Sequence, residues 1–205
     1  ANNGAGICVE GYVAPQSWVN TKVRATLNLN GGRIEGNSTS GMGGGLYVGQ
    51  YATATVSGTT FTGNTASLGG GIATAKMVTK TYNGTTTKCE PKLTVNSAVI
   101  NGNTATSNAL ASGIYNEGCD LEMGGSSVNI TDNIYLNDNA YPITLTGSMR
   151  TGRVYNIALN ATSTNANAFK GGDVVVKPSR YPSNAAQYLR YNIPLQAGYV
   201  FAKGS

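Results

Sequence analysis

The chain has 205 residues and a net charge of +5, and its 28 glycines are about twice the usual share for a soluble protein. This length suffices for one domain with its own core, and a 40% share of hydrophobic residues excludes a disordered chain. No stretch approaches about 18 consecutive apolar residues, so we predict no membrane-spanning segment. The basic residues are scattered rather than clustered with aromatic residues, which argues against a nucleic-acid partner.

Threonine, asparagine and glycine are plentiful, and long apolar runs with helical period are missing. This composition is typical of short strands separated by turns, so we predict an all-β fold. Polar strands with no histidine and few charges also favour an exported, extracellular protein.

A repeated phrase recurs between residues 27 and 138. The copies are "LNLNGGRIEGNSTSGMGGGLYV" (27–48), "ATVSGTTFTGNTASLGGGIATA" (54–75) and "LTVNSAVINGNTATSNALASGIYNEG" (93–118), followed by the degraded copy "LEMGGSSVNITDNIYLND" (121–138). Each clear copy contains alternating apolar residues, one large apolar residue, Gly-Asn, and a glycine phrase that ends in Leu or Ile. Repeats of this period indicate stacked units, each of which completes its core only against its neighbours.

Each copy contains three short β-like runs, which is the pattern of a short right-handed parallel β-helix, a solenoid whose coils pair edge to edge. Residues that share a place in the repeat should then form buried columns. The asparagine after the glycine suits a turn, because its amide can bond backbone groups of its own or the next coil. The predicted core residues are Ile34, Leu46, Phe61, Ile72, Ile100 and Ile114, and the predicted turn residues are Asn37, Asn64 and Asn103.

The third copy is longer than the second. Asn37 and Asn64 are 27 residues apart, whereas Asn64 and Asn103 are 39 apart, and the excess falls in "MVTKTYNGTTTKCEP" (77–91). We predict a hairpin there, since Asn83-Gly84 between threonine and tyrosine residues is a strong turn signal.

Beyond residue 138 the Gly-Asn period is lost. We therefore predict β-helix coils over 1–138, including an N-terminal cap or first coil, and a C-terminal capping and flanking β segment over 139–205. Within the second segment, "PSNAAQYLRY" (182–191) predicts a short helix.

"FTGN" followed by "GGGIA", with "GGGLY" before it, resembles the Phe-x-x-Asn and Gly-Gly-Ala/Leu-Ile phrases of the chlamydial polymorphic outer-membrane-protein repeat. More broadly, the chain resembles right-handed β-helix segments of large bacterial cell-surface proteins, and 133–149 and 171–201 resemble the stretches that close such helices. The resemblance implies a non-catalytic adhesive or spacer module of a larger exported protein. It also implies a glycan or a host-surface protein as partner, and no cofactor.

The insertion is the predicted contact surface, because it projects from one coil and combines lysine with tyrosine. The candidate ligand-contact residues are Lys76, Lys80, Tyr82, Asn83 and Lys88.

Two alternatives from other functional classes stay open. Parallel β-helices also include polysaccharide lyases and hydrolases, which use clustered carboxylates, so the chain could be such an enzyme or its inactive remnant. Asn116, Glu117, Asp120 and Glu122 are a weak calcium candidate, against the alternative of an exposed polar turn. An ice-binding solenoid is the minor alternative, because threonine pairs occur at 53/55, 104/106 and 144/146, although not at one place in the repeat.

Three cysteines fit neither a zinc site nor a disulfide-rich scaffold. Cys89 and Cys119 enter the first strands of adjacent copies, so they form a disulfide candidate if their Cα atoms come within about 7 Å. We expect Cys8 to be a small buried hydrophobic residue.

Overall fold

The computed structural model describes residues 2–13, 22–82, 84–149, 155–161, 166–170, 173–178 and 189–191. Within these ranges the regular structure is strand, apart from one 3-10 turn at Ala109–Ala111, so the all-β prediction is confirmed for the described chain. No helix there is long and apolar enough to cross a membrane. The last part of the expected helix over 182–191 is instead strand, at Leu189–Tyr191, and the rest lies outside the described residues.

Two seven-stranded parallel sheets make up most of the molecule. We call them the short-strand sheet and the long-strand sheet. The short-strand sheet contains, in spatial order, β1 (Ile7–Val9), β6 (Leu46–Val48), β9 (Ile72–Thr74), β14 (Ile114–Asn116), β16 (Ile134–Leu136), β18 (Tyr155–Leu159) and β20 (Leu189–Tyr191). The long-strand sheet contains β4 (Ala25–Asn30) with β5 (Arg33–Glu35), then β7 (Ala52–Thr62), β12 (Lys92–Asn101), β15 (Asp120–Ile130), β17 (Ile143–Met149) and β19 (Val176–Pro178).

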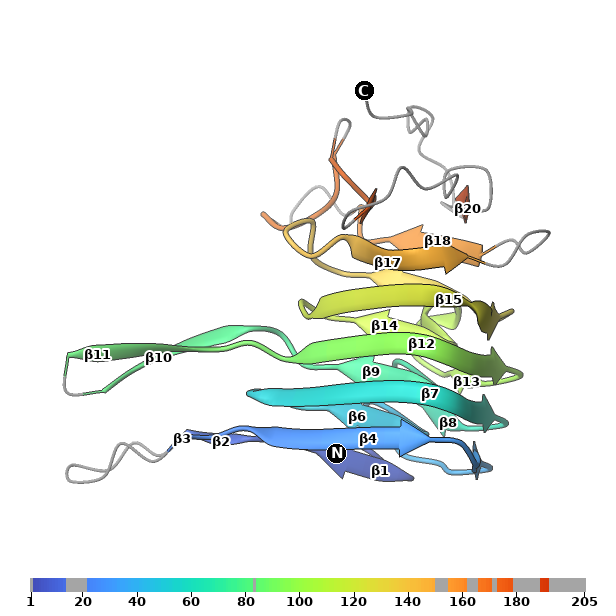
Figure 1. The fold of residues 1–205 in the computed structure, drawn as a ribbon, viewed down its shortest axis with the longest axis horizontal. Coiled ribbons are helices and arrows are strands. Elements are labelled where there is room, and N and C mark those ends of the chain that lie inside the picture. The colour runs from blue at the N-terminus through green and yellow to red at the C-terminus, as the bar shows by residue number, and fades with distance from the viewer. Residues whose placement is uncertain are drawn as a thin grey trace.

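The chain visits the two sheets alternately, so each pass adds one strand to each sheet (Figure 1). A smaller parallel pair is formed by β8 (Thr65–Ala66) and β13 (Thr104–Ala105). In its own pass, each of these strands follows the strand of the long-strand sheet and precedes the strand of the short-strand sheet. Neighbours in each sheet therefore come from consecutive passes. Strand β17 pairs with β15 and β18 pairs with β16, so both sheets continue past residue 138 into the segment that we assigned to a cap.

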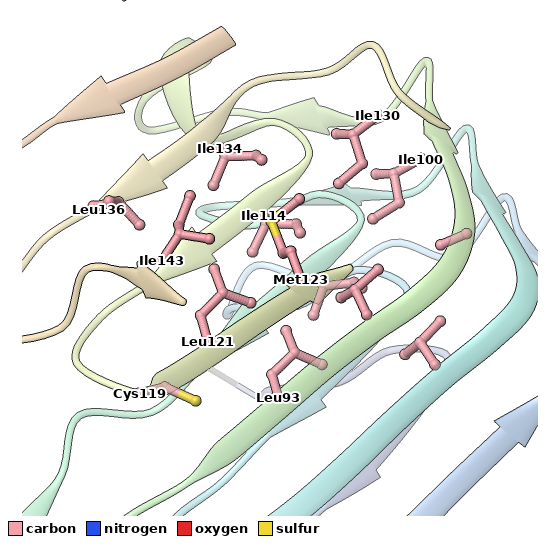
Figure 2. Packing of buried hydrophobic residues seen from close by; sticks show 14 of the residues in the cluster. Leu93, Ile100, Ile114, Cys119, Leu121, Met123, Ile130, Ile134, Leu136 and Ile143 are labelled. Carbon is pink, nitrogen blue, oxygen red and sulfur yellow. The ribbon is translucent and has the colours of Figure 1, made fainter. Parts of the chain in front are cut away.

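The core lies between the two sheets and consists of columns of equivalent residues (Figure 2). Phe61 pairs with Ile34 on one side and Ile100 on the other, and both Phe61 and Ile100 are fully buried. In the short-strand sheet, Ile72 lies between Leu46 and Ile114. Period-2 alternation places these side chains inward, because successive residues of a strand point to opposite faces. The six expected core residues thus form two columns across three passes.

The expected turn residues form a ladder of side-chain amides. Asn37 donates to Asn64 Oδ1 from its backbone N–H (3.1 Å) and from Nδ2 (3.0 Å). Asn64 donates in the same way to Asn103 Oδ1, at 3.0 Å for both bonds. Asn103 donates to Asp132 Oδ2 from its backbone N–H (2.9 Å) and from Nδ2 (2.8 Å). The ladder lies at the corner where the long strands end. It provides partners for backbone groups that would otherwise be buried without a hydrogen bond.

The glycine phrase is explained by close backbone approach next to this ladder. A Cβ on Gly71 would lie 2.7 Å from the carbonyl oxygen of Gly113 and 3.1 Å from Ile100 Cγ2. A Cβ on Gly45, one pass earlier, would lie 2.6 Å from the Gly71 oxygen and 2.7 Å from Phe61 Cδ1. Only glycine fits where the backbone of one pass touches the large residue of the next. The phrase recurs because every pass repeats this contact.

Candidate functional site

The insertion in the third repeat forms the predicted hairpin. Strand β10 (Val78–Tyr82) pairs antiparallel with β11 (Thr85–Cys89), from Val78 opposite Cys89 to Tyr82 opposite Thr85. The hairpin extends away from the stack, at the left in Figure 1. Its strands bond to each other and to no other strand of the described chain. Ligand-contact residues on this hairpin are therefore presented outside the core.

The two lysines of the hairpin lie on opposite faces. Lys80 is opposite Thr87, whereas Lys88 is opposite Thr79. Directly opposite residues share a face and consecutive residues alternate, so Lys80 and Lys88 point to different sides. Both lysines are exposed. A ligand on one face of the hairpin would meet one of these lysines but not both.

Of the remaining candidates, the structure describes Lys76 and the backbone of Tyr82. Lys76 lies before the hairpin, and its Nζ is 3.8 Å from Asp138 Oδ2, a carboxylate that is 4% exposed. This ion pair ties Lys76 to the stack. Tyr82 closes the strand pairing by its backbone, and Asn83 lies outside the described residues.

A second antiparallel pair, which the sequence did not predict, follows β1. Strand β2 (Tyr12–Val13) pairs with β3 (Lys22–Val23), with Tyr12 opposite Val23. These two side chains are 55% and 53% exposed, so they form an apolar surface pair. The sequence signal was weak, because two-residue strands are too short to show alternation.

Both antiparallel pairs leave the stack at the same corner, where the chain passes from the short-strand sheet to the long-strand sheet. The first lies between β1 and β4 and the second between β9 and β12. The pass between them makes this turn with residues 49–51 alone. Since β1, β6 and β9 are successive neighbours, the two excursions start about 10 Å apart. We call this region the hairpin corner.

Arg24 joins the bases of the two excursions. Its Nη1 donates to the carbonyl oxygen of Glu90 at 3.1 Å and lies 3.4 Å from Thr53 Oγ1. Its guanidinium carbon is 4.3 Å from the centre of the Tyr51 ring, a cation–π arrangement. Arg24 therefore contacts two further passes across the hairpin corner. No motif marked this residue, because its partners are 27 to 66 positions away in the sequence.

The calcium candidate is not assembled. Lys92 Nζ lies 2.6 Å from Glu122 Oε1 and 3.7 Å from Asp120 Oδ2, so an ammonium occupies the space between these carboxylates. Asn116 Oδ1 accepts bonds from Thr74 Oγ1 and from the Cys119 backbone N–H, at 3.1 and 2.8 Å. Among the residues that the structure describes, no group of three or more His, Cys, Asp or Glu side chains could hold a metal ion.

Glu117, the fourth candidate ligand, is partly buried beside Lys76. Desolvation by burial raises the pKa of its carboxyl, and the backbone N–H and charge of Lys76 oppose this shift. The carboxyl group of Glu117 thus has a raised pKa.

The outward threonines of the long-strand sheet form a broken column. Thr55 pairs with Thr94, Thr94 with Glu122, and Glu122 with Thr144. Thr53 pairs with Lys92, and Thr104 lies on β13, outside this sheet. The charged residues interrupt the regular threonine array that the ice-binding alternative needs.

The disulfide candidate is not formed in the structure. Cys89 and Cys119 are both buried free thiols, and burial raises the pKa of the Cys119 thiol. Their Sγ atoms lie 3.9 Å from the Thr87 carbonyl oxygen and 3.5 Å from that of Asp120. The expectation of a buried Cys8 is wrong, because Cys8 is exposed on the outer face of β1.

No family model matches the chain, and neither the curated proteins nor the solved structures contain a significant match.

Proposed function

We propose that the chain is a short right-handed parallel β-helix that acts as a non-catalytic extracellular surface module, adhesive or spacer. Two parallel sheets visited alternately, with buried columns and an amide ladder at one corner, support the β-helix. The repeat phrases, which resemble those of bacterial cell-surface β-helices, support the location and role.

The observation that carries the adhesive role is the hairpin corner. Two antiparallel excursions leave one corner of a regular stack two passes apart, while the pass between them turns in residues 49–51. The excursions contribute little to the core and present exposed Tyr12, Val23, Lys80 and Lys88. Such a surface on a rigid scaffold suits recognition of a glycan or of a protein on another cell.

The arrangement of the carboxylates supports the enzyme alternative less well than it supports the non-catalytic proposal. Glycosidases need two carboxyl groups on either side of the scissile bond, and lyases of this class need a calcium site. Asp120 and Glu122 share Lys92 instead. The non-catalytic proposal is therefore consistent with the contacts of Lys92 as they are observed, and it does not require them to rearrange.

The test is binding of the 205-residue chain to a glycan array and to immobilised cell-surface protein, compared with three variants. Removal of residues 78–88 should abolish most binding. Lys80→Ala and Lys88→Ala are a matched pair, because these residues lie on opposite faces of one hairpin. We expect one of the two to weaken binding at least several-fold more than the other. Undiminished binding of the deletion variant would overturn the hairpin β10–β11 as the site.

A further inference from the structure

The hairpin corner carries cations that no carboxylate of the protein neutralises. The two segments that cross from one sheet to the other with a hairpin, 10–24 and 75–91, contain five basic residues and two acidic ones. All nine carboxylates of the sequence lie in the described part of the chain, and none forms an ion pair with Lys22, Arg24, Lys80 or Lys88. All four of these side chains are exposed. The hairpin corner therefore presents unpaired positive charge, on the side to which both hairpins extend in Figure 1.

The two acidic residues of these segments have other contacts. The side chain of Tyr141 hydrogen-bonds the carboxylate of Glu90. The side chain of Glu10 lies against Gly49, where an added Cβ would come 3.0 Å from Glu10 Cδ. Neither carboxylate is paired with Arg24, so an anionic ligand does not have to displace one of them.

Arg24 is held by contacts with the next two passes. Its Nη1 donates to the Glu90 carbonyl oxygen at 3.1 Å and lies 3.4 Å from Thr53 Oγ1, while the Tyr51 ring lies under the guanidinium. No described residue accepts a hydrogen bond from Nε or Nη2 of Arg24. A guanidinium binds a carboxylate best through two parallel N–H groups, and the Nε–Nη2 edge is such a pair. Arg24 thus offers a positioned and unused edge at the base of both hairpins.

Tyr51 has a strained backbone beneath this guanidinium. It is the one non-glycine residue of the described chain with a positive φ, at 54°. This left-handed geometry brings a Cβ close to the following carbonyl oxygen, so glycine is the usual residue there. The Ala25 N–H donates to the Tyr51 carbonyl oxygen at 3.3 Å and helps to hold the turn. Such strain concentrates at binding sites, and here it places an aromatic ring against Arg24.

The hairpins add further cations and many hydroxyl groups. Lys22 lies two residues before Arg24 and points to the same side of the extended chain, toward the next passes. The hairpin β10–β11 contributes Lys80 and Lys88 on its two faces. It also contains five threonines, which are Thr79, Thr81, Thr85, Thr86 and Thr87. Threonine hydroxyls both donate and accept hydrogen bonds, so they suit a ligand rich in hydroxyl groups.

We infer that the hairpin corner binds an acidic polysaccharide built from uronic acid units, with the carboxylate of one unit on the free edge of Arg24. This inference rests on the proposed function, because it names the partner of the same site. The two hairpins start about 10 Å apart, so a ligand that contacts both meets several unpaired cations. A polymer with regularly spaced carboxylates matches these cations, and its hydroxyls match the threonines.

A nucleic acid fits this surface less well. Single-stranded nucleic acids need aromatic rings on which their bases stack. One face of the Tyr51 ring is already covered by Arg24. Tyr12 pairs with Val23, whose side chain points to the opposite side of the chain from that of Arg24. The cations and the exposed aromatic ring of the first hairpin therefore do not share one face.

Binding of the 205-residue chain to immobilised polygalacturonate, alginate and hyaluronan tests the inference, with a chelator present so that calcium does not bridge carboxylates. The carboxyl-methylated form of each polymer is the matched neutral probe. We expect the chain to bind at least one of the three polyuronates. The methylated form of that polymer should bind at least about tenfold more weakly, because it cannot form a charge-assisted pair with Arg24.

Substitutions at the corner locate the site. Arg24→Gln should weaken binding by about tenfold, and Arg24→Lys should also weaken it, because lysine keeps the charge but lacks the planar edge. Arg33→Gln is the matched control, since Arg33 is an exposed cation that already pairs with Glu35, and it should bind like the parent. If Arg24→Gln fails to fold, Lys22→Gln replaces it as the test, because the exposed Lys22 side chain forms no ion pair.

A parent chain that binds none of the three polyuronates would overturn the inference. If that chain still binds a neutral glycan or a cell-surface protein, the proposed function stands without the inference, and if it binds nothing, both fail. Equal binding of the methylated polymer would overturn the role of the carboxylate. Binding of dextran sulfate or single-stranded DNA as tight as that of the polyuronate would overturn the choice of partner.

Discussion

At the residue scale, the repeat is explained by what each position touches in the neighbouring pass. Phe61 is fully buried between Ile34 and Ile100, and it also lies against the position that must be Gly45. Asn64 supplies the acceptor for Asn37 one pass earlier. A residue type therefore recurs because the same inter-pass contact recurs, rather than because of a local preference alone.

Truncating Phe61 should be strongly destabilising. Phe61→Ala leaves a cavity in a fully buried column and should lower the free energy of unfolding by about 3–5 kcal/mol. Thr60→Ala, on the outward face of the same strand, should change it by about 0.5 kcal/mol or less. Urea unfolding of both variants measures the difference, and equal effects would contradict the buried column.

Breaking the amide ladder should also cost stability. Asn103→Ala removes the acceptor of the Asn64 backbone N–H and the donor to the Phe61 carbonyl oxygen, both of which are buried. We expect the free energy of unfolding to fall by about 1–3 kcal/mol, since the groups left behind are unpaired. Asn28→Ala, on the exposed face of β4, is the control. If urea unfolding finds the two variants alike, the ladder is not a stabilising element.

The raised pKa of Glu117 predicts a specific pH dependence. A carboxyl group with a higher pKa in the folded protein binds its proton more tightly when folded, so the folded state is favoured at low pH. This advantage is lost as the pH rises from the unfolded pKa of about 4.3 through the raised folded value. Glu117→Gln should remove this loss and make the protein relatively more stable at neutral pH. Urea midpoints across this pH range measure it, and parallel profiles for the two proteins would contradict it.

At the element scale, most of the hairpin β10–β11 lies outside the stack. Its strands pair with each other, and Lys80 and Lys88 are exposed. The C-terminal part of the insertion is different, because Cys89 is fully buried. The boundary between structural and presented residues therefore falls inside the insertion.

Removal of residues 78–88 should leave the stack folded. Loop length affects stability only weakly, so we expect the melting temperature to change by about a few degrees. Thermal unfolding followed by circular dichroism measures this. Extending the deletion to Cys89 is the comparison, because it removes a buried side chain and should cost more. Unfolding of the shorter deletion would show that the hairpin is structural.

At the scale of the whole molecule, the position of a residue in the stack should decide how much a given substitution lowers the free energy of unfolding. Leu27 and Leu93 occupy one inward column, on either side of Ala54, but Leu93 is fully buried and Leu27 is half-buried at the end. Leu93→Ala should cost about 2–5 kcal/mol and Leu27→Ala clearly less. A Leu27→Ala variant destabilised as much as Leu93→Ala would contradict this gradient.

The sequence by itself determined the all-β class, the hairpin at 77–91 and the places of Ile34, Phe61 and Ile100 in one column. These follow from period-2 alternation, an Asn-Gly turn and repetition, all of which are local properties. Only the tertiary structure decided that Asp132 ends the asparagine ladder, that Lys92 separates Asp120 from Glu122, and that Arg24 reaches Glu90. These contacts join residues from different passes, so they depend on the exact register between passes. A side chain's partner is fixed by that register, and no single stretch of sequence contains it.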